Sequence, residues 1–333
     1  MIIAEIAQAH DGSVGILHSY IDALAATGVD VIKFQTHIAD AESSEFEPFR
    51  KKFSYVDKSR FDYWKRMELT LEQWQQIKKH CDEVNVEFMS SPFSCEAVNL
   101  LEKLNVKRYK IGSGEVTNHL LLRKIAAMCK PVILSSGMSS YEELDEAVEI
   151  FTSENIAVSV LQCTTAYPTT PNEWGLNIIR TLKERYNIPT GFSDHSGDIY
   201  ACLAATALGA EIIEFHAVFD KRMFGPDASS SIEIDDVRRL VDGVKQIRRS
   251  LLKVLSKDSE AEKVEKLKMM FGKSLAINRD LPEGYILTEE DLEAKKPSGY
   301  GIPAKDYEKA IGKRLKCSLK QWDFLESVHI QSP

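Results

Sequence analysis

Eight short apolar runs alternate with longer amphipathic stretches, and this alternation restricts the fold more than any other feature of the chain. Such alternation is typical of parallel strands joined by crossover helices. The runs are IIAEIA (2–7), DVIKFQT (30–36), VEFMSSP (86–92), RYKIGSG (108–114), PVILSSG (131–137), VSVLQCTT (158–165), TGFSDH (190–195) and EIIEFHAV (211–218). Eight such units in about 250 residues predict a (β/α)₈ TIM barrel.

The stretches between the runs carry helix signals. TLEQWQQIKKHCDEV and SYEELDEAVEIFTSE are amphipathic, and the second opens with Ser140 as a candidate N-cap, followed three residues later by Glu143. An open doubly wound sheet is the alternative fold. It is disfavoured because no glycine-rich GxGxxG turn follows the first run.

The sequence changes character after the last of these units. Residues 1–252 are predicted to form the barrel, and residues 253–269 a charged, partly helical linker. Residues 270–333 mix short strands with turn dipeptides, which predicts a small β-rich second domain. Within the barrel, residues 37–70 are rich in aromatic and charged side chains. We expect an active-site loop there, because disordered segments are poor in aromatic residues.

The charge balance excludes some classes of partner. Lys and Arg number 42 against 50 Asp and Glu, and the net charge of −8 argues against nucleic acid and anionic membranes. The start MIIAEIA has no basic region, and no stretch reaches the ~18 apolar residues of a membrane span, so we expect a cytoplasmic protein. The cysteines form no CxxC pair, so neither a disulfide framework nor a thiolate zinc site is expected.

Ionisable side chains interrupt the apolar run EIIEFHAV. Because side chains alternate along a strand, Glu214 and His216 share one face. Burial of even a neutral polar group without a partner costs roughly 2–7 kcal/mol, so a metal, a ligand or a polar network has to compensate this pair. A hydrogen-bonded histidine and glutamate in the core is the alternative for this strand taken alone.

Polar residues also occur near the carboxyl ends of the other seven runs, where TIM-barrel active sites lie. They are Glu5, Gln8, His10, Lys33, Gln35, Ser90, Ser91, Lys110, Ser113, Glu115, Ser135, Ser136, Thr164, Thr165, Tyr167, Ser193, Asp194 and His195. Exposure of the barrel mouth to solvent explains any one of these polar residues, but it explains the whole set poorly. We therefore predict a polar site at this end of the barrel.

Two lysines and two histidines in this set suggest what the site binds. Lys33 and Lys110, surrounded by hydroxyl side chains, suit a phosphate and a carboxylate, although either alone could be a surface lysine with a buried stem. His195 and His216 end adjacent runs, where two imidazoles could bind one divalent ion and leave positions open for water or substrate. A hydrogen-bonded histidine pair without a metal is the alternative.

A set of longer motifs resembles one known family. The chain contains, in order, EIAQAHDG, DVIKFQTH, YKIGSGE, ILSSGM, LQCTTAYPT, GFSDHSG, EFH and FGPDAS. In this order they resemble the sialic acid synthases, which make nine-carbon α-keto sugar acids. The segment from about residue 270 is similar to that family's C-terminal SAF domain, which is itself similar to type III antifreeze proteins. The resemblance covers essentially the whole chain and implies a TIM barrel followed by this antifreeze-like domain.

The resemblance implies condensation of phosphoenolpyruvate with an N-acetylated amino sugar. The sugar would be N-acetylmannosamine or a 2,4-diacetamido-trideoxyhexose, and the products N-acetylneuraminate or a legionaminate-type acid, with phosphate. A divalent cation is implied, Mn²⁺ first and Mg²⁺ second, which would polarise the sugar aldehyde as a Lewis acid. A homodimer is also implied, in which the C-terminal domain covers the partner's active site.

The resemblance assigns roles residue by residue. It implies His195 and His216 as metal ligands. The positions implied to hold phosphoenolpyruvate or to line its site are Lys33, Ser91, Lys110, Ser113, Ser135, Thr165, Tyr167, Ser193 and Glu214. Positions around the metal, the water and the sugar are matched by Glu5, Gln35, Glu115 and Asp227. Either Glu5 or Glu115 could orient or deprotonate the attacking water.

The chain departs from the family pattern at three positions. Ala9 and Thr165 stand where many or some relatives have asparagine. Lys296, in KKPSGYG, stands where several bacterial relatives have an arginine that reaches the substrate's acetamido group. We expect Lys296 to contact the sugar, although lysine cannot make the planar, bidentate contacts of arginine.

Three other functions stay open at this point. One is condensation of phosphoenolpyruvate with a different aldose, such as a phosphorylated sugar, which would require a further cluster of cations that the sequence does not show. A non-catalytic sugar-binding barrel would not need the predicted metal site. A metal-activated hydrolase would leave the two lysines unexplained.

Overall fold

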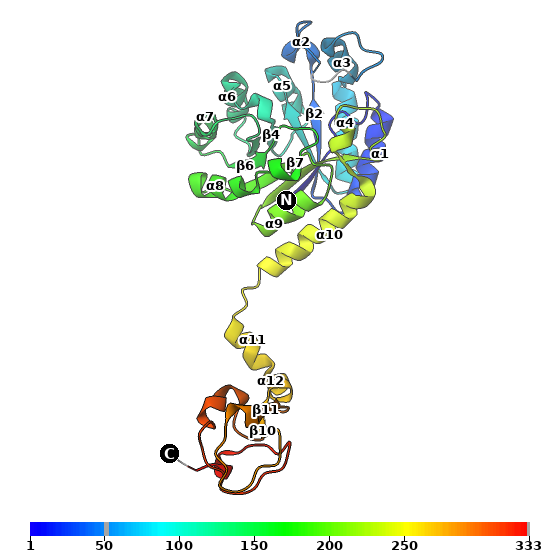
Figure 1. Ribbon diagram of the computed structural model, residues 1–333. Coiled ribbons are helices and arrows are strands. Elements are labelled where there is room, and N and C mark those ends of the chain that lie inside the picture. Colours follow the sequence, from blue (N-terminus) through cyan, green and yellow to red (C-terminus); the bar gives the residue numbers. More distant parts are fainter. Residues whose placement is uncertain (50–52, 332–333) are drawn as a thin grey trace. The chain divides into compact units, whose positions relative to one another are not determined.

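The computed structural model describes residues 1–49 and 53–331. The chain divides into two compact units, Met1–Leu252 and Lys253–Pro333, which are described separately below. In the first unit, strands occupy the centre and helices surround them (Figure 1).

The first unit is a closed barrel of eight parallel strands. They are β1 (Ile2–Glu5), β2 (Val31–Thr36), β3 (Glu87–Pro92), β4 (Tyr109–Ile111), β5 (Val132–Ser135), β6 (Val158–Cys163), β7 (Thr190–Asp194) and β8 (Ile212–Val218). Each strand pairs with the next in the sequence, and β1 pairs with β8 to close the sheet. The predicted (β/α)₈ barrel is confirmed, and the open doubly wound sheet is excluded. A two-residue strand, β9 (Ile232–Glu233), adds to β8.

Several strands end earlier than the sequence predicts. The run predicted over 108–114 forms a strand only at Tyr109–Ile111, and Ser113–Glu115 form a 3₁₀ turn. The run predicted over 131–137 forms a strand only over Val132–Ser135. The polar residues and glycines that follow leave the sheet, and Ser113 and Glu115 among them line the cavity at the mouth of the barrel.

Helices follow the strands and cover the outside of the barrel. They are α1 (Val14–Ala25), α4 (Leu71–Glu83), α5 (Cys95–Lys103), α6 (His119–Ala126), α7 (Tyr141–Thr152), α8 (Leu176–Tyr186), α9 (Tyr200–Ala207) and α10 (Ile234–Leu251). Helix α7 begins as predicted, because the Ser140 hydroxyl accepts from the Glu143 amide and the Glu143 carboxylate accepts from the Ser140 amide. Apolar residues of these helices pack against the outward faces of the strands.

The described residues of the segment after β2 form a small core of their own. This segment contains α2 (Ala39–Glu42) and α3 (Arg60–Met67). Ala39, Tyr63, Trp64 and Met67 are buried against one another, with phenylalanine rings packed around them. The aromatic content noted in the sequence therefore builds a wall beside the barrel mouth.

The second unit has its own apolar core. It begins with α11 (Lys257–Lys263) and α12 (Glu265–Phe271), and contains the antiparallel strands β10 (Ser274–Ile277) and β11 (Leu292–Lys295). Its core is formed by Leu275, Ile277, Leu281, Leu287, Ile302, Ala310, Leu315, Leu319, Leu325 and Ile330. Among the residues that the structure describes, no helix is both long and apolar enough to cross a lipid bilayer.

Candidate active site

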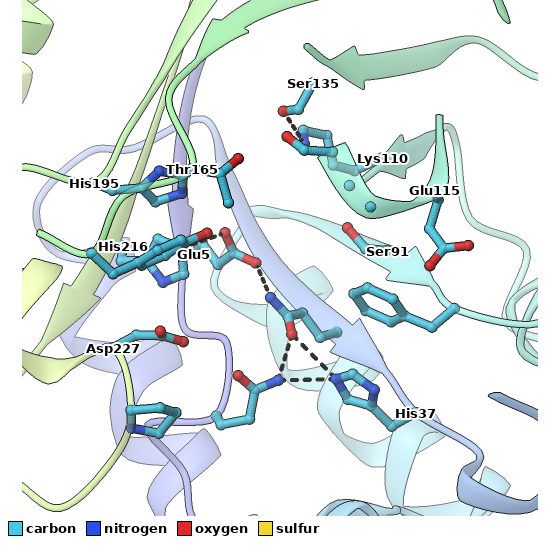
Figure 2. Close-up of a pocket in the computed structure, with 18 of the residues that line it drawn as sticks. Glu5, His37, Ser91, Lys110, Glu115, Ser135, Thr165, His195, His216 and Asp227 are labelled. Carbon is cyan, nitrogen blue, oxygen red and sulfur yellow. Dashed lines mark hydrogen bonds and ion pairs between the residues drawn. The ribbon is translucent and has the colours of Figure 1, made fainter. Parts of the chain in front are cut away.

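A cavity of about 520 Å³ lies at the carboxyl ends of the barrel strands. It is lined by every barrel residue to which the family resemblance assigns a role: Glu5, Lys33, Gln35, Ser91, Lys110, Ser113, Glu115, Ser135, Thr165, Tyr167, Ser193, His195, Glu214, His216 and Asp227. Figure 2 shows His195, His216 and Asp227 on one side of this cavity, and Lys110 with Ser135 on another. Lys296 belongs to the second unit, where its ammonium lies 4.9 Å from the centre of the Phe271 ring.

Two buried lysines and two buried carboxylates form the floor of the cavity. The Lys33 ammonium lies 2.9 Å from Glu5 Oε2 and 3.1 Å from Glu214 Oε1. The Lys110 ammonium lies 3.3 Å from the same Glu214 oxygen and donates to the Ser135 hydroxyl at 2.7 Å. Both lysines are almost completely buried, so the alternative of surface lysines is excluded.

Burial and the mutual attraction of opposite charges shift the pKa values of these two lysines and two carboxylates. Burial alone would lower the pKa of Lys33, but the carboxylates of Glu214 and Glu5 outweigh it and raise that pKa. Burial likewise opposes ionisation of both carboxyls, yet the nearby lysines bring the pKa values of Glu5 and Glu214 below their ordinary range. For Lys110, burial dominates and lowers the pKa. An anion arriving beside Lys110 would favour its charged form.

Three buried polar atoms at this site have no hydrogen-bond partner among the described residues. They are Ser91 Oγ, Glu214 Oε2 and His216 Nδ1. The other oxygen of Glu214 accepts from the Ser193 hydroxyl at 3.0 Å as well as facing the lysines. Unsatisfied buried polar groups cost about 1–3 kcal/mol each, so the cavity is built to receive polar groups of a ligand or of water.

The two histidines lie side by side at the ends of β7 and β8. Their ring centroids are 5.2 Å apart, and the Tyr167 ring lies 4.2 Å from that of His195. His195 Nδ1 is 3.0 Å from the Thr164 carbonyl oxygen, and His216 Nε2 is 3.1 Å from Glu5 Oε2. Among the described residues, no three His, Cys, Asp or Glu side chains are grouped closely enough to hold a metal ion.

A glycine brings the backbone after β5 close to the neighbouring loops. The Gly137 amide donates to the Ser113 hydroxyl at 3.0 Å. A Cβ at this position would lie 2.5 Å from Thr165 Oγ1 and 2.7 Å from Ser113 Oγ, both far inside contact distance. Ser113 and Thr165 can therefore line the cavity together only because position 137 has no side chain.

Some polar residues at the strand ends face away from the site. The Ser90 and Thr36 hydroxyls are hydrogen-bonded to each other at 2.7 Å, and the Ser136 hydroxyl donates to Gln162. His10 Nδ1 accepts from the Gly12 amide. Alternation along β3 explains the orientation of Ser90, because only every second side chain of a strand reaches the interior. His10 lies in a turn after β1.

The structure adds lining residues that the motif comparison did not single out. The insertion after β2 supplies His37, Glu42, Glu47, Phe53, Arg60, Tyr63 and Trp64, other loops supply Gln8, Phe93 and Met138, and strand β6 supplies Cys163. The aromatic and charged composition of the insertion was the available signal. It located the wall but not its members, because the helices of the insertion, α2 and α3, are too short for a hydrophobic periodicity to show which side chains turn inward.

Comparisons with known proteins identify the family. The NeuB family model matches residues 20–255, and the SAF domain model matches residues 272–321. The chain belongs to the NeuB family. The resemblance to sialic acid synthases is confirmed.

Relatives and solved structures within this family match nearly the whole chain. The N,N'-diacetyllegionaminic acid synthase of Campylobacter jejuni is 35% identical, covering 94% of this chain and 95% of the relative. The human N-acetylneuraminate-9-phosphate synthase is 31% identical, covering 97% and 90%. The crystal structure of N-acetylneuraminic acid synthetase from Leptospira borgpetersenii, in complex with citrate, matches with a TM-score of 0.70 and 31% identity. That match covers 80% of this chain and 90% of the other.

Proposed function

We propose that this NeuB-family chain condenses phosphoenolpyruvate with an N-acetylated amino sugar to give a nonulosonic acid and phosphate. The observation that carries the proposal is the pair of buried lysines, held with two carboxylates and several hydroxyls in one cavity of a nonulosonate-synthase fold. The relative named N,N'-diacetyllegionaminic acid synthase supports a 2,4-diacetamido-trideoxyhexose as the first sugar to test. N-acetylmannosamine is the second.

In this proposal, Lys110 and its neighbours bind phosphoenolpyruvate. The anionic ligand competes with Glu214 for the ammonium groups of Lys110 and Lys33, and the hydroxyls of Ser135 and Ser193 supply directional donors. The ligand also provides a partner for Ser91 Oγ, which has none among the described residues. The proposal thus accounts for the buried cations that a simple hydrolase would leave unexplained.

The reaction has a definite balance of bonds. The C2=C3 π electrons of phosphoenolpyruvate form the new bond from C3 to the open-chain aldehyde carbon, which leaves C2 cationic. The aldehyde C=O π bond breaks, and its oxygen takes up a proton to become a hydroxyl. Water adds to the cationic C2, and the bond between C2 and the phosphate oxygen then breaks. Glu5, held between Lys33 and His216, orients that water, and Glu115, whose pKa is raised by burial, is the alternative residue that accepts its proton.

The proposal includes a divalent ion, supported by two neighbouring imidazoles that can offer ring nitrogens to it. The Thr164 carbonyl can only accept, so His195 carries a proton on Nδ1 and directs Nε2 toward the cavity. Burial opposes the charged form, but Cys163 and the Thr164 carbonyl outweigh it and raise the pKa of His195 to about 9, so a bound cation would displace the Nε2 proton. Burial lowers the pKa of His216, which favours the neutral, metal-binding form. A bound Mn²⁺, or Mg²⁺, would polarise the aldehyde as a Lewis acid. The two imidazoles are its proposed ligands, with remaining positions taken by water or substrate.

One assay tests the proposal. The chain is incubated with phosphoenolpyruvate, Mn²⁺ and a panel of N-acetylated and phosphorylated sugars, while phosphate release and product mass are followed. We expect sugar-dependent phosphate release and a product whose mass equals phosphoenolpyruvate plus sugar plus water minus phosphoric acid. Release only with a phosphorylated aldose would favour that alternative, and sugar-independent release would favour a hydrolase. Sugar binding without release would favour a non-catalytic barrel.

A homodimer in which the second unit covers the partner's cavity belongs to the same proposal, as does a cytoplasmic location. Sedimentation velocity tests the dimer directly. A barrel truncated after Leu252, mixed with a full-length chain inactivated by His216→Ala, tests the covering role. Restored use of the sugar in the mixture would support a contribution from the partner's second unit.

A further inference from the structure

A continuous chain of hydrogen bonds joins the insertion after β2 to Glu5. Gln35 Nε2 donates to Glu5 Oε1 at 2.7 Å, and Gln8 Nε2 donates to Gln35 Oε1. Gln8 Nε2 also lies 2.9 Å from His37 Nε2, and His37 Nδ1 lies 2.6 Å from Glu42 Oε1. Figure 2 shows His37 at one end of these hydrogen bonds and Glu5 at the other.

His37 Nε2 also lies 3.2 Å from Gln35 Oε1, so the ring faces both glutamines. One arrangement of protons satisfies the links that run through Gln8. An ionised Glu42 can only accept, so His37 carries its proton on Nδ1 and presents an unprotonated Nε2 to Gln8. The Gln8 amide nitrogen then donates to His37 and to the oxygen of Gln35. With its oxygen engaged in this way, Gln35 turns its own amide nitrogen toward Glu5.

His37 and Glu42, at the outer end of this series of hydrogen bonds, are held in place by their neighbours. The His37 ring is stacked between Trp64, at 4.1 Å between ring centroids, and Phe93, at 4.5 Å. The second oxygen of Glu42 accepts from the Ile38 amide at 3.3 Å. His37 is 6% exposed, so water does not compete freely for its nitrogens. The ring can therefore impose its orientation on the two glutamines.

We propose that His37 and Glu42 are positioning residues, which act through Gln8 and Gln35 to set the orientation of Glu5. If Gln35 turned over, its oxygen would face the Glu5 carboxylate, and the repulsion would displace Glu5 from Lys33 and His216. The insertion thus controls the carboxylate that faces the reacting water. This inference rests on the proposed function for its kinetic consequence, but the hydrogen-bond arrangement itself does not depend on that function.

The kinetic test uses a double-mutant cycle. His37→Phe keeps a ring between Trp64 and Phe93 but removes both hydrogen bonds, and Gln8→Leu breaks the next link. We expect each to lower kcat about 10-fold or more, with the KM for phosphoenolpyruvate within about twofold of the wild-type value. Because both act through Gln35, the double variant should be no slower than the slower single variant.

Two controls separate positioning from packing. Glu42→Gln keeps an oxygen that can accept from His37 Nδ1, so we expect it to retain most of the kcat that Glu42→Leu loses. His18→Phe, which removes the histidine bonded to His80 on the outer helices, should leave kcat unchanged. Wild-type kcat in His37→Phe, or losses that multiply in the double variant, would overturn the proposal.

A second measurement does not depend on activity. ¹⁵N NMR of the histidine-labelled chain should show His37 as the neutral tautomer with its proton on Nδ1, in a signal assigned by its loss in His37→Phe. A proton on Nε2 instead would overturn the proposal even if the enzyme assay succeeds. If the wild-type chain shows no condensation, the proposed function fails, and the NMR result still decides whether His37 holds Gln8 as inferred.

Discussion

Two layers of side chains lie inside the barrel and differ completely in chemistry, although the same strands supply both. The lower layer consists of Ile3, Val31, Met89, Ile133, Leu161 and Ile212. Two residues further along the same six strands, the upper layer consists of Glu5, Lys33, Ser91, Ser135, Cys163 and Glu214. Because side chains alternate along a strand, each upper residue lies on the same face as the lower one.

Burial does not distinguish the two layers. Ile3 is 0% exposed and Glu5 only 3%, while Val31 is 1% and Lys33 3% exposed. The lower layer is closely packed: at Gly191 on β7, a Cβ would lie 2.3 Å from the Ile212 carbonyl oxygen. The lower layer gains stability from apolar burial alone, at about 25 cal/mol per Å². The upper layer must offset the desolvation of its charges and still leaves polar atoms without partners.

The contrast indicates that the lower layer stabilises the barrel and the upper layer serves a ligand. A buried ion pair is weak evidence for a stabilising role, since its desolvation can exceed its Coulombic gain. Substitutions in the two layers should therefore affect different measurements, and the predictions below are ordered by the size of the expected effect.

The largest effect is expected at His216, which lies on β8 two residues beyond Glu214 of the upper layer. His216→Ala should lower kcat by roughly 1,000-fold or more, because a metal-polarised aldehyde contributes several kcal/mol to the transition state. Thermal unfolding of the variant should stay cooperative, and its Mn²⁺ affinity, measured by calorimetry, should fall. Full activity of wild-type enzyme after rigorous chelation would rule out the metal.

The second prediction compares a residue of the lower layer with a residue of the upper layer on the same strand, β5. Ile133→Ala in the lower layer should reduce the free energy of unfolding by about 2–5 kcal/mol, because it leaves a cavity in a packed core. Ser135→Ala, two residues later, should change stability little and raise the KM for phosphoenolpyruvate, because it removes the hydroxyl beside Lys110. Urea unfolding and steady-state kinetics on both variants make the comparison. Equal destabilisation by both would show that the layers do not differ in role.

A third effect is expected at Lys110, which lies beside Ser135 and Glu214 of the upper layer. Lys110→Met removes a buried cation but keeps the length of the side chain, and the loss of a charge-assisted contact of about 1.5–3 kcal/mol should raise the KM for phosphoenolpyruvate roughly 10- to 100-fold. The KM for the sugar should change far less. An equal change for both substrates would argue against Lys110 as the residue that binds phosphoenolpyruvate.

The smallest effect tests whether the site extends beyond the barrel. Lys296→Ala, in the second unit, should raise the KM for the sugar several-fold, since a hydrogen bond to a neutral acetamido group contributes about 0.5–1.5 kcal/mol. The KM for phosphoenolpyruvate should stay constant. Lys296→Arg is the matched control, because it retains the charge and adds planar donors. Unchanged sugar kinetics in Lys296→Ala would leave the barrel alone responsible for sugar binding.

Much of the fold was predictable from local patterns. All eight strands, the helix after Ser140 and the second, β-rich segment follow from hydrophobic periodicity and capping residues. The strand ends were not predictable, because apolar runs such as RYKIGSG continue into residues whose backbone leaves the sheet. The motifs also selected residues that line one cavity, since alternation places them at the ends of strands that close on one another.

The sequence by itself determined which faces of the strands point inward, and so which lysines, carboxylates and histidines meet. Periodicity and the order of strands are local properties of the chain. Only the tertiary structure decided the partners within that set, such as the placement of Glu214 between Lys33 and Lys110. It also decided that His37 and Glu42, from an irregular insertion, reach Glu5 through two glutamines. Contacts of this kind depend on distances between residues far apart in the chain, and no local pattern records them.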